Sequence, residues 1–446
     1  MDELFSKAPV KKAYFTLALP VVMGMITTMI YNLADTIFIA KTGNPKLVAG
    51  VTIGAPLFTL LLAIADIFGL GGSSVASRLL GEKHYDQVKR VNSFCIYGGI
   101  IMGIALTVIL LVFERPFLHL LGANASTYKQ AAAFYRILSF GATFVILSVI
   151  PQNLIRTEGL AKQAMIAAVA GTVLSIILDP IFIFAFRLGT AGVASANVIG
   201  YICSDLVLVY MINHRARYVP LNIRFLTFNP RMIWEVTKIG IPSSITNFAL
   251  TFGMALLNSS LAVYGASIVA AMGITQKIYG VLILVIVGFA FGAQPLIGYN
   301  YGAHQWQRLH EIISFDFMVQ IVYAVIVGGL LIIAAHPVSA LFMHQEIIVN
   351  ASAYMLRATV ITTPVVGIIM VYTTVFQSIG NATGAFIMSI SRQGIIYWLV
   401  LEILKAWVGY HGIVWSQAVA DILTCLIGFV IYHGVLDWKD RLPSKK

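Results

Sequence analysis

The sequence has few charged residues. Asp, Glu, Lys and Arg make up 11% of its 446 residues, whereas soluble domains contain about 25%. Hydrophobic residues account for 59% of the chain, and its mean hydropathy is +0.88. Its apolar runs extend over about 20 residues, whereas a strand of a membrane barrel would alternate over about 10. These features exclude a soluble or disordered chain and predict an all-α polytopic membrane protein.

Cysteine is also scarce, and the usual enzyme motifs are missing. The three cysteines, Cys95, Cys203 and Cys425, all fall in apolar runs without paired spacing, so we expect no disulfide framework and no metal site. The sequence contains no zinc-binding motif, no nucleophile elbow and no phosphate-binding loop. We therefore predict a protein that is not an enzyme and carries no cofactor.

The positive charges are unevenly distributed. The formal net charge is +11, which in a soluble protein would suggest nucleic acid as a partner. Here 20 of the 29 Lys and Arg residues fall at the N-terminus, the C-terminus and every second connection, 6 fall on the other side, and 3 fall within apolar runs. Positive charge concentrates on the cytoplasmic side of membrane proteins. We therefore expect both termini in the cytoplasm and no nucleic-acid partner.

Hydropathy predicts twelve membrane spans in two groups of six. The expected spans are 14–40, 47–79, 91–113, 131–155, 164–186, 191–212, 234–264, 267–296, 311–335, 347–379, 384–408 and 412–435. The longest polar connection lies at the middle of the chain, between the sixth and seventh spans. We therefore predict an N-terminal lobe, 1–213, a cytoplasmic linker, 214–233, and a C-terminal lobe, 234–446.

The two halves repeat each other at an offset of 220 to 222 residues. Leu19-Pro20 corresponds to Ile241-Pro242, and Leu47-Val48-Ala49 corresponds to Ile268-Val269-Ala270. The same offset relates the glycine and arginine pairs Gly81 and Gly302, Arg136 and Arg357, Gly159 and Gly380, and Gly192 and Gly412. An even number of spans per half means that both repeats enter the membrane from the same side. The lobes are therefore expected to form a parallel repeat, with a substrate path at their interface.

Two carboxylates lie within apolar spans of the first half. Asp35 has no basic residue within helical reach, and Asp179 precedes Pro180. A carboxylate at membrane depth costs a few kcal/mol, so such residues are candidates for function. At a separation of about 5 Å their repulsion is roughly 3 kcal/mol, which favours binding of a proton or a monovalent cation. Their counterparts in the repeat are apolar, Leu257 or Leu256 for Asp35 and Leu399 for Asp179, so we expect ion chemistry in the N-terminal lobe alone.

Polar residues at helical spacing accompany these acids. Ser175 and Asn197 are candidates for completing the ion site, because each shares a helical face with another polar side chain. The alternative is that these groups make interhelical hydrogen bonds that hold the bundle together. The further candidates for the substrate pathway are Thr28, Tyr31, Asn32, Gln152, Asn153, Tyr201 and Lys277.

Two prolines are candidate hinges. Pro20 and Pro242 lie early in the first and seventh spans, where proline removes a backbone hydrogen bond and favours a kink. Pro20 is 15 residues before Asp35, so ion binding there would be coupled to bending of the helix. The alternative is a static kink.

The sequence resembles the multidrug and toxic compound extrusion (MATE) family over nearly its whole length. The motifs that carry the resemblance are Leu19-Pro20, the surroundings of Asp35, Arg78-Leu79-Leu80-Gly81, Leu178-Asp179-Pro180, Gly189-Thr190-Ala191-Gly192, Gln294-Pro295-Leu296 and Asn300-Tyr301-Gly302-Ala303. The similarity is to the bacterial branch with its acidic pair in the N-terminal lobe, because the seventh span has no carboxylate. Ser175 stands where many relatives have asparagine, which shifts the expected coupling ion from Na⁺ towards H⁺.

The resemblance implies a monomeric antiporter that exports amphipathic, mostly cationic organic compounds by alternating access and contributes to antibiotic resistance. Asp35 and Asp179 would bind the coupling H⁺ or Na⁺, with Asn197 and Gln152 at neighbouring polar positions. A lipid-linked saccharide flippase of the same superfamily is the alternative, although the acids of the N-terminal lobe argue against it. A channel or receptor is the alternative from outside transporters.

Overall fold

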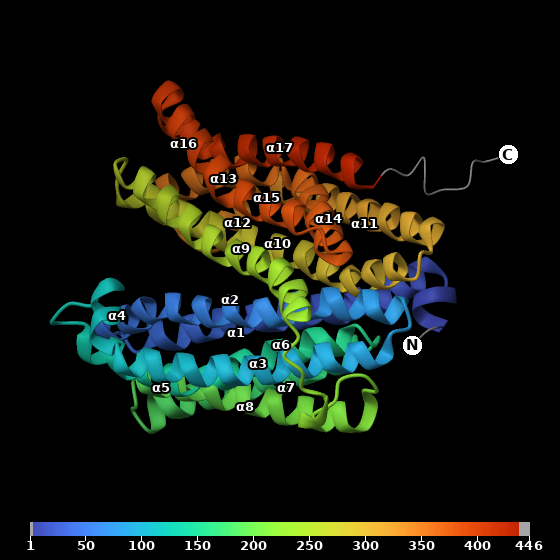
Figure 1. The fold of residues 1–446 in the computed structure, drawn as a ribbon. Coiled ribbons are helices and arrows are strands. Elements are labelled where there is room, and N and C mark those ends of the chain that lie inside the picture. Colours follow the sequence, from blue (N-terminus) through green and yellow to red (C-terminus); the bar gives the residue numbers. More distant parts are fainter. Residues whose placement is uncertain (1–2, 437–446) are drawn as a thin grey trace. The chain divides into compact units, whose positions relative to one another are not determined.

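The computed structural model describes residues 3–436, and in this range it is almost entirely helical (Figure 1). The α-helices are α1 (Val10–Lys41), α2 (Pro45–Gly81), α3 (Tyr85–Val112), α4 (Glu114–Leu120), α5 (Tyr128–Phe140), α6 (Ala142–Arg156), α7 (Ala161–Pro180), α8 (Thr190–Arg215), α9 (Pro230–Ala262), α10 (Ala266–Gly302), α11 (Trp306–Ile333), α12 (Ala335–Ala340), α13 (Glu346–Val360), α14 (Thr363–Ile379), α15 (Ala382–Gln393), α16 (Ile395–Val408) and α17 (Tyr410–Val435). Short π-helical turns, η1 (Glu3–Lys7) and η2 (Ile181–Ala185), and a 3₁₀ turn, η3 (Ile223–Phe225), complete the pattern.

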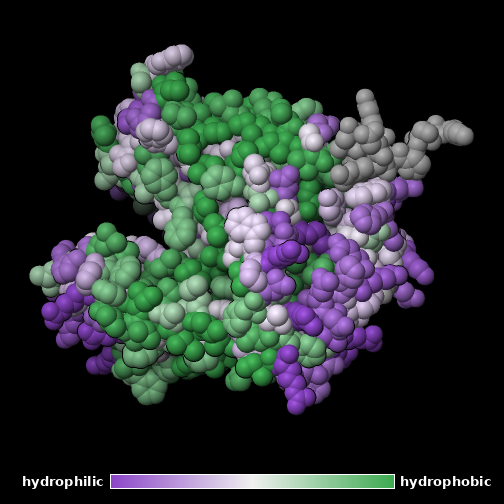
Figure 2. Space-filling view, in the orientation of Figure 1, coloured by the Kyte–Doolittle hydropathy of each residue, from purple (hydrophilic) through white to green (hydrophobic). Residues whose placement is uncertain are grey.

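Among the described residues, ten helical segments are long and apolar enough to cross a membrane, or twelve if two bent pairs count as one span each. The bent pairs are α5 with α6, at 50°, and α13 with α14, at 46°. α15 and α16 form a single candidate span broken at Gly394. Apolar side chains cover the flanks of the helices, and polar ones gather at their ends (Figure 2). The predicted class, an all-α protein with about twelve spans, is confirmed.

The backbone repeats as the sequence does. Positive φ angles are found at corresponding positions in the two halves, where the chain turns between spans. The matched pairs are Gly43 (62°) and Gly265 (106°), Lys83 (62°) and His304 (55°), Gly159 (83°) and Gly380 (80°), and Gly189 (59°) and Gly409 (62°). The bends between α5 and α6 and between α13 and α14 also correspond. The repeat is therefore structural, down to single turns.

The chain divides into two compact units, and the division falls inside helices. The N-unit comprises residues 23–244, and the C-unit comprises residues 3–22 with residues 245–436. The boundaries lie two residues after Pro20 in α1 and two residues after Pro242 in α9. The sequence placed the division in the connection 214–233 instead. Residues 1–2 and 437–446, at the outer ends of the predicted lobes, lie outside the described residues.

The beginning of α1 packs within the C-unit. A methyl group added at Gly292 of α10 would lie 2.3 Å from the Cα of Ala18, so only glycine permits this close approach. One turn earlier, Gly288 meets Val22 in the same way. The Tyr14 hydroxyl donates a 2.7 Å hydrogen bond to Asp316 of α11, whose side chain is fully buried. The first turns of α1 are thus built into the C-unit.

The beginning of α9 packs within the N-unit at repeat-equivalent positions. A methyl group added at Gly240 would lie 2.1 Å from the carbonyl oxygen of Ile67 in α2. One added at Gly71 would lie 2.3 Å from the carbonyl oxygen of Val236. Gly71 corresponds to Gly292, and Gly240 to Ala18. The same glycine-mediated contact between helices therefore occurs once in each unit.

The connection between α8 and α9 is tied to the N-unit by a buried carboxylate. Glu158, between α6 and α7, accepts hydrogen bonds from the backbone N–H groups of Arg217 (2.7 Å) and Tyr218 (2.8 Å). Burial raises the pKa of Glu158, while these hydrogen bonds act in the opposite direction. The predicted linker is thus an ordered segment held against the helix ends.

Candidate functional site

Asp35 and Asp179 both belong to the N-unit, on α1 and α7. Asp179 is fully buried, and Asp35 is half-buried. Asp179 is the last residue before Pro180, which has no N–H to continue the helix. The chain passes there from α7 into the π-helical turn η2. Such turns are frequent at functional sites, because they disturb the regular backbone pairing.

The carboxylates lack hydrogen-bond partners. Both side-chain oxygens of Asp179, and Oδ1 of Asp35, are buried without any partner in the described part of the chain. The two groups are close enough for the charge of Asp35 to act on Asp179. Buried carboxylates normally carry partners, because an unpaired one costs several kcal/mol. This unpaired pair is therefore suited to binding a cation or a proton.

Tyr31 joins the pair, one helical turn before Asp35. Its hydroxyl lies near enough to both carboxylates to interact with their charges, and it is also near Tyr201 of α8. It approaches the Asn197 side chain, but the contact lacks normal hydrogen-bond geometry, and the oxygen is buried without a partner. Asn197 itself donates to the Val193 carbonyl at 3.2 Å. The structure thus brings Asp35, Asp179, Tyr31, Asn197 and Tyr201 together.

Ser175 is close in sequence to Asp179, but its hydroxyl is engaged elsewhere. The hydroxyl donates to the carbonyl oxygens of Gly171 (3.1 Å) and Ala196 (3.2 Å), which joins α7 to α8. A methyl group added at Gly200 would meet this hydroxyl at 1.9 Å, so the two helices are in close contact here. Ser175 therefore offers an ion only its acceptor lone pairs.

Asn153 belongs to a different cluster. Its side-chain oxygen accepts a 3.1 Å hydrogen bond from Arg156, and its amide nitrogen donates to Val149. Arg156 in turn lies near Asp66 of α2, which gives this buried arginine an opposite charge. Gln152, also in α6, is half-buried. The structure therefore assigns Asn153 to an arginine cluster, not to the carboxylate pair.

Three further predicted residues are exposed. Thr28 and Asn32 are exposed on α1, and the Thr28 hydroxyl donates back to Gly24. Lys277 is exposed on α10, in the C-unit. Their roles in a substrate pathway stay predictions.

Sequence reasoning missed several buried acids. Asp205 lies one turn after Tyr201 on α8, and both of its oxygens are buried without a partner. Asp316 and Asp421 are fully buried in the C-unit, so buried acids are not confined to the first half, while ion chemistry in the N-terminal lobe alone stays a prediction. The signal was available in the spacing, since Tyr201 and Asp205, and Gln417 and Asp421, are each four residues apart.

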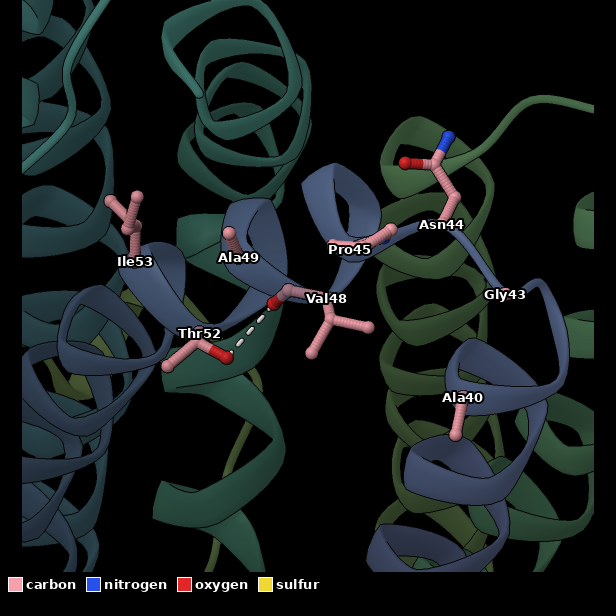
Figure 3. Close-up of a pocket in the computed structure, with 8 residues that line it drawn as sticks. All are labelled: Ala40, Gly43, Asn44, Pro45, Val48, Ala49, Thr52 and Ile53. Atoms are coloured by element: carbon pink, nitrogen blue, oxygen red, sulfur yellow. Dashed lines mark hydrogen bonds between the residues drawn. The ribbon is translucent and has the colours of Figure 1, made fainter. Parts of the chain in front are cut away.

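One hollow in the N-unit has neither Asp35 nor Asp179 in its lining. It measures about 610 Å³ and lies at the turn between α1 and α2 (Figure 3). Its lining residues are uncharged: Ala40, Gly43, Asn44, Pro45, Val48, Ala49, Thr52 and Ile53. Thr52 donates to the Val48 carbonyl within α2. With no charged group in its walls, this hollow does not supply ion chemistry.

Comparison with known proteins identifies similar chains. The family model MatE matches residues 20–181 and 242–401, one stretch in each repeat. Multidrug export protein MepA of Staphylococcus aureus is 31% identical over 433 residues, which cover 97% of this chain and 96% of the relative. MepA of Staphylococcus saprophyticus is 29% identical over 442 residues, covering 99% and 97%.

A solved structure shares the fold. It is described as the outward-facing conformation of a multidrug resistance MATE family transporter of the MOP superfamily. The likeness has a TM-score of 0.92 at 24% identity and covers 99% of this chain and 98% of that one.

Proposed function

The chain belongs to the MatE family of multidrug transporters, and from this premise we propose that it exports amphipathic, mostly cationic organic compounds in exchange for protons bound at Asp35 and Asp179. The family itself, multidrug efflux and a multi-pass membrane architecture follow from the comparisons and the candidate spans. The predicted resemblance is confirmed. Because the relatives are transporters, the prediction that the chain is not an enzyme is confirmed too.

The observation that carries the proposal is the fully buried Asp179 with two unpartnered oxygens. A carboxylate in this state is stabilised by whatever cation reaches it, either a proton or the positive group of a substrate. Two such ligands that neutralise the same charge exclude each other. Mutually exclusive binding is what an antiporter needs, since proton uptake then weakens substrate binding and substrate binding expels the proton.

The arrangement supports protons over Na⁺. A metal cation must exchange its hydration shell for several protein oxygens. Around Asp179, the Ser175 hydroxyl is directed to two backbone carbonyls, and the Asn197 nitrogen is bonded to Val193. These bonds leave the Ser175 and Asn197 oxygens free, so the preference for protons rests on the single hydroxyl at position 175, where many relatives have an amide, and a proton needs only the carboxylate.

Two carboxylates also affect the driving force for export, because they allow two protons to be exchanged per substrate. Moving one charge through a potential of about 150 mV supplies about 3.5 kcal/mol. Exchange of one monovalent cation for one proton moves no net charge, so only the pH difference would drive it. Two protons per substrate would use the membrane potential as well, and Asp35 and Asp179 provide two sites.

Pro20 and Pro242 are proposed as the hinges of this cycle. Each lies two residues before the point where its helix leaves one compact unit for the other. Proline weakens the helix there by one hydrogen bond. A bend at these positions would let the helix ends keep their glycine contacts while the remainder of each helix changes direction.

We further propose a bacterial inner-membrane location with both termini in the cytoplasm, based on the distribution of Lys and Arg. A monomer suffices for this mechanism, because all groups of the proposed ion site lie in one chain. No observation favours the saccharide flippase.

Vesicle transport tests the proposed coupling. Purified protein in liposomes loaded with a fluorescent organic cation is given either a pH gradient or a Na⁺ gradient, with the membrane potential clamped. We expect the pH gradient alone to drive transport, at a rate that saturates with substrate. Transport driven equally well by Na⁺ at uniform pH would contradict proton coupling.

A further inference from the structure

The C-unit contains a cavity of its own. It measures about 150 Å³ and lies among α9, α10, α13, α15, α16 and α17. Its apolar walls include Leu250, Met254, Leu257, Met272, Ile283 and Val414. A cavity of about 150 Å³ is large enough for a single aromatic ring. The space therefore fits one ring or a small headgroup of a larger compound.

Arg392, one member of a buried ion pair, contributes to the polar side of this cavity. Arg392 of α15, which lines it, is 7% exposed, and its Nε donates a 3.1 Å hydrogen bond to Oδ1 of Asp421. A second guanidinium nitrogen, Nη2, donates to the Tyr279 hydroxyl at 3.2 Å. The guanidinium is thus held in place by two partners, as a recognition site requires.

The acid of the pair is already engaged by three hydrogen-bond donors. Asp421 accepts hydrogen bonds from Arg392 and from Gln417 (3.0 Å) at Oδ1, and from Thr362 (3.2 Å) at Oδ2. Its charge is balanced by the guanidinium. Asp421 therefore differs from Asp179, whose oxygens have no hydrogen-bond partner among residues 3–436.

Hydrogen-bond donors, in contrast, are available. The remaining nitrogen of Arg392, Nη1, makes no hydrogen bond to the residues that the structure describes. Tyr397, also in the lining, is 1% exposed; its hydroxyl approaches Ser416 without normal hydrogen-bond geometry and has no hydrogen-bond partner in the same part of the chain. Gln276, half-buried on α10, adds an amide. The cavity presents donors that need an acceptor.

The repeat sharpens this contrast. Leu257, in the wall of the cavity, corresponds to Asp35, and Asp421 corresponds to Tyr201. Gln417 corresponds to Asn197. Where the N-unit has Asp35, with a buried oxygen that has no partner among the described residues, the C-unit thus has a leucine, and the acid of the C-unit is already bonded to Gln417.

We propose that the C-unit cavity is a second binding subsite, which takes a ring bearing an acceptor oxygen, such as a carbonyl or carboxylate, and holds that oxygen with Arg392, Tyr397 and Gln276. This inference rests on the proposed export function and adds a substrate class to it. Compounds with a cationic group and an acceptor oxygen on a ring are favoured over cations that lack the oxygen.

Three dyes with one chromophore test the subsite. Rhodamine 110 carries a benzoic acid, rhodamine 123 carries its methyl ester, and the matching rosamine lacks both. Binding to detergent-purified full-length protein is followed by fluorescence anisotropy. We expect the acid and the ester to bind about tenfold or more tighter than rosamine, the scale of one hydrogen bond to a charged donor. If the acid binds more tightly than the ester, the ligand group is a carboxylate; if the ester binds as tightly or more tightly, it is a carbonyl oxygen.

Two variants locate the effect. The charge-balanced R392Q/D421N removes the ion pair without leaving a buried charge unpaired. Q276L leaves the pair intact. Each is expected to reduce binding of the acid and the ester towards that of rosamine, and to leave rosamine unchanged. Lys405→Gln is the control for loss of a cation in the same unit, because Lys405 lies outside the cavity lining and pairs with Glu402.

Equal affinity of the wild type for all three dyes, no measurable binding of any of them, or equal loss for all three in Q276L would overturn the proposal. Binding in detergent needs no ion gradient. A failure of the subsite therefore appears in the anisotropy data, and a failure of ion coupling appears in vesicle transport.

Discussion

Replacement of Asp179 with asparagine will reduce ion-driven export by about 100-fold, within the range of coupling free energies between linked sites. Asparagine has nearly the shape of aspartate but cannot ionise, so it neither releases a proton nor attracts a cation. Asp35→Asn will have the same direction of effect, because the two charges act on each other. The measurement is dye efflux from liposomes under an imposed pH gradient.

A matched control separates loss of the site from loss of any carboxylate. Asp86→Asn makes the same chemical change in the first turn of α3, where the side chain is exposed. It should transport like the wild type. Undiminished efflux in Asp35→Asn and Asp179→Asn alike would refute the proposed mechanism.

Gly240→Ala will destabilise the folded protein by about 3 kcal/mol, at the upper end of the usual cost of overpacking. The added methyl carbon would lie 2.1 Å from the carbonyl oxygen of Ile67 and 2.7 Å from its Cα, and neither atom can rotate away. The beginning of α9 must then separate from α2. The unfolding midpoint in detergent, followed by intrinsic fluorescence, measures this loss.

Gly329→Ala in α11 is the comparison for this change. No atom lies within 4 Å of its added methyl group, so alanine there should be neutral or stabilise the helix by up to about 1 kcal/mol. If both variants unfold at the same temperature, the close contact between α2 and α9 is not important for stability.

Hydropathy was sufficient to predict the spans, because burial in lipid depends on composition and length. The repeat offset predicted corresponding turns, and these are seen at Gly159 and Gly380, with φ of 83° and 80°. The carboxylate pair was accessible for the same reason, since an acid within an apolar run stands out. These features are local, and a linear sequence displays local features directly.

Contacts between segments that are distant in the sequence could not be predicted from the sequence. The first turns of α1 pack within the C-unit and those of α9 within the N-unit, and these contacts depend on Gly292 and Gly240. The residues next to these glycines in the sequence do not indicate which helix each glycine contacts. Asn153 shares a polar character with Asn197, yet it accepts a hydrogen bond from Arg156, three residues later on α6, so this local pairing was overlooked rather than hidden by the fold. Arg392 lies near the start of a span, so its pairing with Asp421 required the fold.

Proton release on substrate binding tests the central claim most directly. A saturating organic cation is added to detergent-purified protein in weakly buffered solution near neutral pH, and the pH change is recorded. If Asp35 and Asp179 bind protons that substrate displaces, the wild type will acidify the solution and the D35N/D179N variant will not. The same proton release from D35N/D179N, with substrate still bound, would contradict the account.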